Sequence, residues 1–195
     1  MIPVIREPLE FYHLVPDNIS LTNDGIVSLE YFYINDKRLY SKYTDKYRDR
    51  LVNEWNIYPN RDKESLSIEE IHDGINKFRD DSIDGNNRIY LFRYLPYRDL
   101  GINMSKLLDS KRAFKIDIES SNSRQYIKRI DWGYWMNDSR NRRLNRHYYI
   151  NVDKDDYFKY YDDNDSMSFR TLNHIAIIPK NNRLPLRLWE EVDIE

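Results

Sequence analysis

The histidines are the residues whose neighbours in the sequence bear most directly on chemistry, and the chain has four of them. His72 stands beside Asp73, away from the apolar side of a predicted helix, and we expect it to be exposed and without a chemical role. His174 lies inside an apolar run, which favours a hydrogen-bonded histidine of the core. His13 and His147 have neighbours that are more suggestive of a site.

His13 belongs to the run Glu10-Phe11-Tyr12-His13-Leu14-Val15, which a turn and then Asp24-Gly25-Ile26 follow. This layout resembles the first strand of ADP-ribosyltransferase-like domains. The resemblance implies that His13 bonds the adenosine ribose of NAD and that a tyrosine stacks on the nicotinamide ring. The tyrosines that come soon after His13 are Tyr31, Tyr33, Tyr40 and Tyr43.

The resemblance also implies a catalytic glutamate that stabilises the oxocarbenium ion formed as nicotinamide leaves. Glu119 follows a strand-like run and is the only glutamate between Glu70 and Glu190, so it is the candidate. Leu14 and Val15 follow His13 where the family has a small residue, and no Ser-Thr-Ser strand is visible. The alternative that Tyr12 and His13 belong to a core strand therefore stays open.

Several familiar sites are missing from the sequence. The five glycines are far apart, which excludes a Walker loop and a dinucleotide-binding glycine turn. The chain has no cysteine, so disulfides and cysteine-bound metals are excluded. The acidic stretch 162–166 starts like a calcium loop but has Met167 where that loop needs glycine. We therefore expect no metal.

Basic residues gather between Lys111 and His147, with ten basic residues against four acidic ones. Tryptophans and tyrosines interleave with them, and this mixture suits phosphate contacts and base stacking. The predicted nucleic-acid-binding residues are Arg124, Lys128, Arg129, Arg140, Arg142, Arg143 and Arg146. Aromatic residues with arginine also mark protein–protein hot spots. The aromatics could equally be core residues under an ordinary charged surface.

His147 adds a second resemblance within this segment. Arg140 and Arg142 precede it at the spacing of the R-x(4–6)-H ribonucleases of the HEPN type. In such enzymes the pair lies on a helix, whereas His147 leads into a strand-like run.

Helices and strands alternate in a way that predicts the fold class. Tyrosines repeat every three or four residues between Asp36 and Trp55, which predicts a helix. Ser67 and Glu70 have the capping-box spacing at the start of a second helix. A short helix is predicted over 103–110 and another over 153–161. Strands are predicted over 10–15, 25–34, 88–95, 113–118, 147–152 and 172–179. We expect a single α+β domain over residues 1–195, a curved, mostly antiparallel sheet with helices packed against it.

Composition places the chain among folded proteins. Hydrophobic residues make up 40% and aromatic residues 14%, enough for a core. The first residues do not read as a signal peptide, and no apolar run approaches the length of a membrane span. We expect a soluble, cytoplasmic protein without a membrane partner.

Three functions stay open. The first is an NAD-dependent ADP-ribosyltransferase-like enzyme that acts on a macromolecule. The second is a non-catalytic interaction protein, such as an immunity factor or a phage or mobile-element protein. The third is a nucleic-acid-binding protein or ribonuclease that uses the basic segment.

Overall fold

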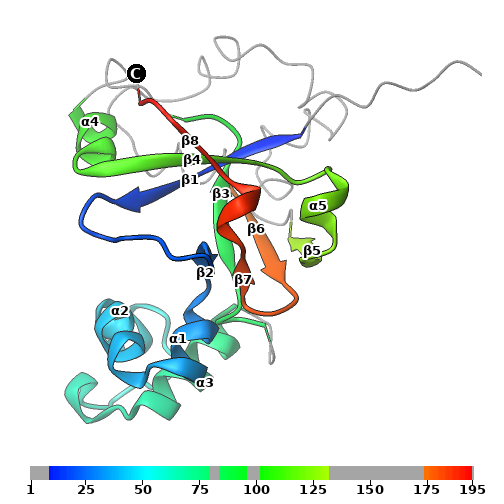
Figure 1. Ribbon diagram of the computed structural model, residues 1–195. Helices are drawn as coiled ribbons and strands as arrows, with labels where there is room; N and C mark the ends of the chain where they lie inside the picture. Colours follow the sequence, from blue (N-terminus) through cyan, green and yellow to red (C-terminus); the bar gives the residue numbers. More distant parts are fainter. Residues whose placement is uncertain (1–8, 80–83, 96–101, 132–173, 195) are drawn as a thin grey trace, which may run out of the picture.

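A six-stranded antiparallel sheet forms the larger part of the fold in the computed structural model, which describes residues 9–79, 84–95, 102–131 and 174–194 (Figure 1). The strand order is β5-β6-β3-β1-β4-β8. The strands are β1 Glu10–Pro16, β3 Ile89–Phe92, β4 Lys111–Asp117, β5 Ile127–Asp131, β6 His174–Pro179 and β8 Glu190–Val192. The sheet twists strongly, so that β1 and β4 run across β3 and β6 in the view of Figure 1.

Alternation along the strands builds the core of the sheet. Phe114 and Ile116 of β4, and Ile118 just after its end, are buried on one face, as their period of two predicts. His13 on β1 lies opposite Phe114 and therefore points to this same face. In β6 the four residues from 175 to 178 are all buried, which is typical of a central strand covered on both sides.

Three helices gather beyond one end of the sheet and have an apolar core of their own (Figure 1). They are α1 Leu29–Asn35, α2 Lys37–Asp49 and α3 Ile68–Phe78. A short π-helical turn, Arg50–Glu54, extends α2, and a 3-10 turn, Lys63–Ser65, precedes α3. The fully enclosed residues of this helical core are Tyr40, Leu51, Leu66, Ile71 and Ile75. Two shorter helices, α4 Ile102–Leu108 and α5 Ser121–Arg124, flank β4.

A two-stranded ribbon stands between the sheet and the three helices (Figure 1). It pairs β2, Ile26–Val27, with β7, Arg183–Leu184. Gly25 enters it with a φ of 70°, and a Cβ atom there would lie 2.3 Å from the Leu184 carbonyl oxygen. Only glycine fits such a close backbone approach. A 3-10 turn, Leu186–Leu188, leads from the ribbon to β8.

Two buried asparagines join the helices to the sheet just before β3. The Asn86 side chain accepts from the Tyr40 hydroxyl at 2.7 Å and donates to the His72 carbonyl and to Asn76 Oδ1, at 2.8 and 2.7 Å. Its backbone carbonyl accepts from the Glu30 amide at 3.0 Å. One residue therefore bonds to all three helices.

Asn87 makes the connection to the sheet and the ribbon. Its side chain donates to the Pro179 carbonyl at the end of β6, at 2.9 Å, and accepts from the Ser28 hydroxyl at 3.0 Å. Gly85 precedes the pair where a Cβ atom would lie 2.4 Å from Asn76 Cα on α3. The loop thus packs against α3 too closely for any side chain at position 85.

The predicted α+β fold is confirmed, and so are the two main helices. α2 follows Asp36, whose carboxylate accepts from the Leu39 amide, and α3 begins with the predicted capping box of Ser67 and Glu70. Tyr40 and Leu51 are fully buried, whereas Tyr43 and Tyr47 are half-buried.

The strand predicted over residues 25–34 is wrong beyond Val27. Ser28 has the extended backbone of a helix start, and α1 follows from Leu29. The aromatic residues that favoured a strand, Phe32 and Tyr33, instead pack on the helical core. Tertiary packing therefore overrides their local strand preference.

Several predictions lie outside the described residues. These are the strand over 147–152, the helix over 153–161, the acidic stretch 162–166 and the arginines at 140, 142, 143 and 146 with His147. The side chain of His174 is likewise not described. Within the described ranges, no helix is both long and apolar enough to cross a membrane.

The asparagine junction yields a stability prediction. Replacing Asn86 by alanine leaves the Tyr40 hydroxyl, the His72 carbonyl and an Asn76 oxygen short of partners in a buried site. Each such loss costs about 1–3 kcal/mol, so we expect Asn86→Ala to lower the free energy of unfolding by about 3 kcal/mol or more. The measurement is urea unfolding, with exposed Asn35→Ala as the control, expected to change stability by less than about 0.5 kcal/mol. Equal effects of the two variants would contradict the role of Asn86.

Candidate ligand-binding pocket

A pocket of about 400 Å³ lies where the end of β1, the loop 17–25, β2, α1 and α2 meet. Three of the four residues predicted to bind a cofactor line it: His13, Tyr31 and Tyr43. They come from β1, α1 and α2. Most of the remaining wall is apolar and comes from Leu14, Val15, Ile19, Leu21, Ile26, Val27, Phe32 and Leu39.

His13 brings a hydrogen-bonding ring to this apolar wall. Its Nδ1 lies 2.8 Å from the Tyr90 carbonyl oxygen on β3. A carbonyl can only accept, so Nδ1 carries the proton and Nε2 of the neutral ring is an acceptor. Burial lowers the pKa of His13, and the bond to Tyr90 opposes this only in part. The ring is therefore a neutral acceptor at physiological pH.

A polar group at the edge of the pocket centres on Asp24. The Tyr31 hydroxyl donates to Asp24 Oδ2 at 2.6 Å, and Arg183 of β7 forms an ion pair with the other carboxylate oxygen. The hydrogen bond to Asp24 raises the pKa of Tyr31. Asp24 is the carboxylate that lines this pocket, and its place just after a turn in the sequence does not indicate such a role.

Tyr43 and Phe32 provide the aromatic part of the wall. Their ring centroids lie 5.0 Å apart with the rings tilted by 44°. The Lys42 ammonium is 5.9 Å from the Tyr43 ring centroid. These rings offer a surface against which a flat ligand can pack.

Tyr33, the fourth predicted residue, does not line this pocket. The Tyr33 ring stacks on His72 with centroids 3.8 Å apart, and the Lys37 ammonium lies 3.0 Å from the Tyr33 ring centroid. His72 Nε2 lies 2.5 Å from a Glu30 carboxylate oxygen. The expectation that His72 is exposed is therefore wrong, because α1 packs over the side of α3 that carries it.

Glu119 lies away from His13. His13 pairs with Phe114, and three more residues of β4, about 10 Å of extended chain, lead to Asp117 before the turn that holds Glu119. The Glu119 carboxylate forms an ion pair with Arg124. The structure therefore does not bring His13 and Glu119 to one pocket, because His13 lies at the middle of the β1–β4 pair and Glu119 lies beyond one end of it.

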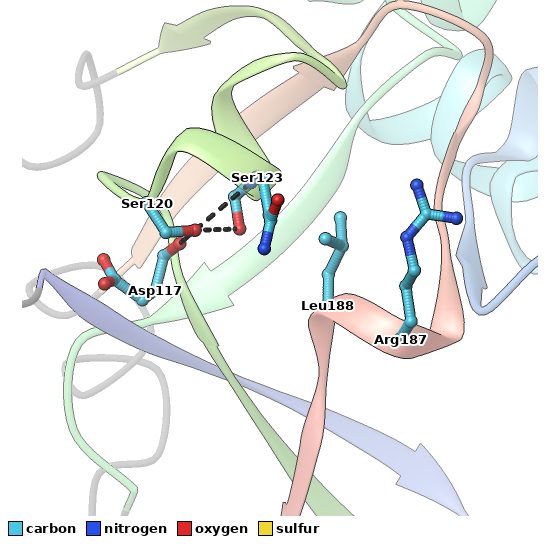
Figure 2. Close-up of a pocket in the computed structure, with 6 residues that line it drawn as sticks. Asp117, Ser120, Ser123, Arg187 and Leu188 are labelled. Carbon is cyan, nitrogen blue, oxygen red and sulfur yellow. Dashed lines mark hydrogen bonds between the residues drawn. The ribbon is translucent and has the colours of Figure 1, made fainter.

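A smaller pocket of about 190 Å³ lies near Glu119 and is shown in Figure 2. The Ser120 hydroxyl bonds to the Ser123 hydroxyl at 2.9 Å and to the Asp117 carbonyl at 3.0 Å. Arg187 and Leu188 form the opposite wall (Figure 2). The serines bond to each other and to the turn at the start of α5, and no histidine lines this pocket. Their arrangement is that of a helix cap.

The described part of the predicted nucleic-acid surface is paired with acidic residues. Lys128 and Arg129 of β5 lie 2.9 and 3.6 Å from Asp84 Oδ2, and Arg124 pairs with Glu119. All three basic side chains are about half-exposed. Their charge is at least partly neutralised on the folded surface.

Among the described residues, no group of three or more histidine, aspartate or glutamate side chains is placed to hold a metal ion. Comparison of the chain with protein-family models, with curated proteins and with solved structures finds no match.

The lowered pKa of His13 predicts a pH dependence of stability. Because the pKa of His13 is lowered in the folded protein, His13 binds a proton below about pH 6.5 in the unfolded chain but remains neutral in the folded protein. The stability that the neutral His13 contributes is therefore fully present above that pH and is lost as the pH falls. We expect the stability difference between wild type and His13→Gln to shrink as the pH falls from about 7.5 to about 5. The measurement is urea unfolding at each pH, in which the other titrating groups cancel. Parallel curves for the two proteins would contradict a neutral, buried His13.

Proposed function

We propose that the pocket between β1, β2, α1 and α2 binds the flat heterocycle of a nucleotide-type ligand, NAD included. The observation that carries the proposal is the meeting of His13, Tyr31 and Tyr43, from three separate elements, around one pocket. Mostly apolar pockets with a few polar groups are the usual form of small-molecule sites.

The polar groups of the pocket suit a ring that carries N–H donors. His13 supplies an acceptor nitrogen, and Asp24 supplies carboxylate oxygens at the edge. A nucleobase or the carboxamide of nicotinamide offers complementary N–H groups. The tyrosine and phenylalanine faces favour a flat ring, and a cationic ring most of all.

The volume of the pocket limits the size of the ligand that it can hold. Sites for small molecules range from about 300 to 1,000 Å³, and this pocket, at about 400 Å³, lies near the lower limit. That volume suits one ring with its sugar. The rest of a dinucleotide would extend over the exposed loop 17–25.

ADP-ribosyl transfer is the narrower form of this proposal. It requires a carboxylate near the bond between nicotinamide and its ribose, where positive charge develops. Asp24 lines the pocket, whereas Glu119 does not. We therefore assign this role to Asp24 if the chain transfers ADP-ribose.

Calorimetry with NAD, nicotinamide and AMP tests binding. Ser20 is exposed at the mouth of the pocket, so a tryptophan there should cover the entrance without disturbing the core. We expect Ser20→Trp to weaken binding by at least about tenfold, or 1.4 kcal/mol. Asn18→Trp is the matched control, because Asn18 is exposed on the same loop but does not line the pocket. No heat with any of the three ligands, or equal weakening by both variants, would refute the site.

Release of nicotinamide from NAD tests the narrower proposal. We expect Asp24→Asn to abolish release, because the neutral amide cannot stabilise a developing cation. Glu119→Gln should retain it, since Glu119 lies away from the pocket. The opposite result would restore Glu119 as the catalytic residue and argue against this pocket.

A further inference from the structure

Three aromatic rings of the helical unit lie next to one another, and two of them are stacked. Trp55, which follows the π-helical turn, stacks on Phe78 at the end of α3, with centroids 3.7 Å apart and ring planes within 4° of parallel. The Tyr47 ring of α2 has its centroid 5.5 Å from that of Trp55, and the two rings are tilted by 35°. We call these three residues the aromatic platform.

One end of the platform is open to solvent. Phe78 is 39% exposed, and Phe78 and Ile34 are the large apolar residues that are exposed in the described parts of the chain. Trp55 and Tyr47, by contrast, pack partly on the helical core. Tyr47 and Trp55 thus attach the platform to the helical core, and Phe78 is its solvent-exposed ring.

Cations surround the platform. The Lys46 ammonium lies 5.2 Å from the Tyr47 centroid, and the Arg50 guanidinium lies 5.7 Å from Tyr47 and 6.0 Å from Trp55. Arg79 lies 5.9 Å from Tyr47 and is held by a hydrogen bond to the Gly85 carbonyl. Three positive charges therefore flank the same rings.

The acidic partner of Arg50 in the described residues holds its charge weakly. Arg50 Nε lies 3.9 Å from a Glu54 carboxylate oxygen, and both side chains are largely exposed, at 46% and 64%. Exposed pairs at this distance contribute little. Arg50 can therefore turn toward an external anion at low cost, and Lys46 is exposed beside it.

We propose that this aromatic platform binds single-stranded nucleic acid, with a base stacked on Phe78 and phosphates contacted by Lys46 and Arg50. Parallel rings can be extended by one further flat ring, and every unpaired base has such a face. The flanking cations match the charge of the phosphates. A duplex keeps its bases within its own stack, and an acidic peptide lacks a regular series of rings.

The test is fluorescence anisotropy with a labelled oligothymidylate at about 50 mM salt. Loss of one stacked base corresponds to a factor of about 5 to 150, so Phe78→Ser should weaken binding within that range. Ile34→Ser is the matched control, because Ile34 is 61% exposed on α1 away from the platform. It should bind as the wild type does.

A charge variant gives an independent measurement. Arg50→Gln should weaken binding and reduce the slope of log affinity against log salt by about 1. Arg38→Gln, an exposed arginine on α2, should leave the slope unchanged. Thermal unfolding of each variant confirms that the fold is intact.

Three results would overturn the proposal. The first is no binding of the oligonucleotide at low salt, and the second is equal weakening by Phe78→Ser and Ile34→Ser. The third is displacement of the oligonucleotide by polyglutamate whose own binding depends on Phe78, which would assign the platform to an acidic protein partner. The test is independent of the pocket, because Ser20→Trp should not alter oligonucleotide binding.

Discussion

Hydrogen bonds of two adjacent asparagines hold the three helices to the sheet. Asn86 bonds to α1, α2 and α3, and Asn87 bonds to the end of β6 and to the residue that starts α1. The sheet and the helices otherwise keep separate apolar cores. A buried amide must have its hydrogen-bond partners in place, and hydrogen bonds are directional. They therefore fix the orientation of the helices on the sheet, which apolar contacts alone would not do. Gly85 makes this possible because it lets the loop lie directly on α3.

The proposed ligand pocket depends on the same junction. His13 is carried by the sheet, whereas Tyr31 and Tyr43 are carried by the helices. The distance across the pocket is therefore set by how the helices meet the sheet. Arg183 adds a second connection, since it reaches from β7 to the carboxylate that also holds Tyr31. Because the junction fixes these elements relative to each other, the pocket keeps its shape in the absence of a ligand.

Local patterns were sufficient to predict much of this fold. The alternation of Phe114 and Ile116, the period of the tyrosines in α2 and the Ser67 capping box are each set by residues a few positions apart. The stretch after Gly25 was misread because Phe32 and Tyr33 favour strands on their own but pack on a helical core here. The pairing of Asp24 with Arg183, 159 positions away, and of His72 with Glu30 could not be read from spacing. For the same reason Glu119 was placed with His13, although the β1–β4 register separates them.

Two apolar cores joined by polar bonds also bear on how the molecule opens. Water can replace the hydrogen bonds of the junction, whereas it cannot replace contacts between enclosed aliphatic side chains. The junction is therefore the place where local opening of the fold begins. The helical unit can then move away from the sheet while both cores remain intact. Backbone amides that cross the junction, such as that of Glu30, would exchange with solvent hydrogen through this opening. Those in the middle of β6 would exchange only when the sheet itself unfolds.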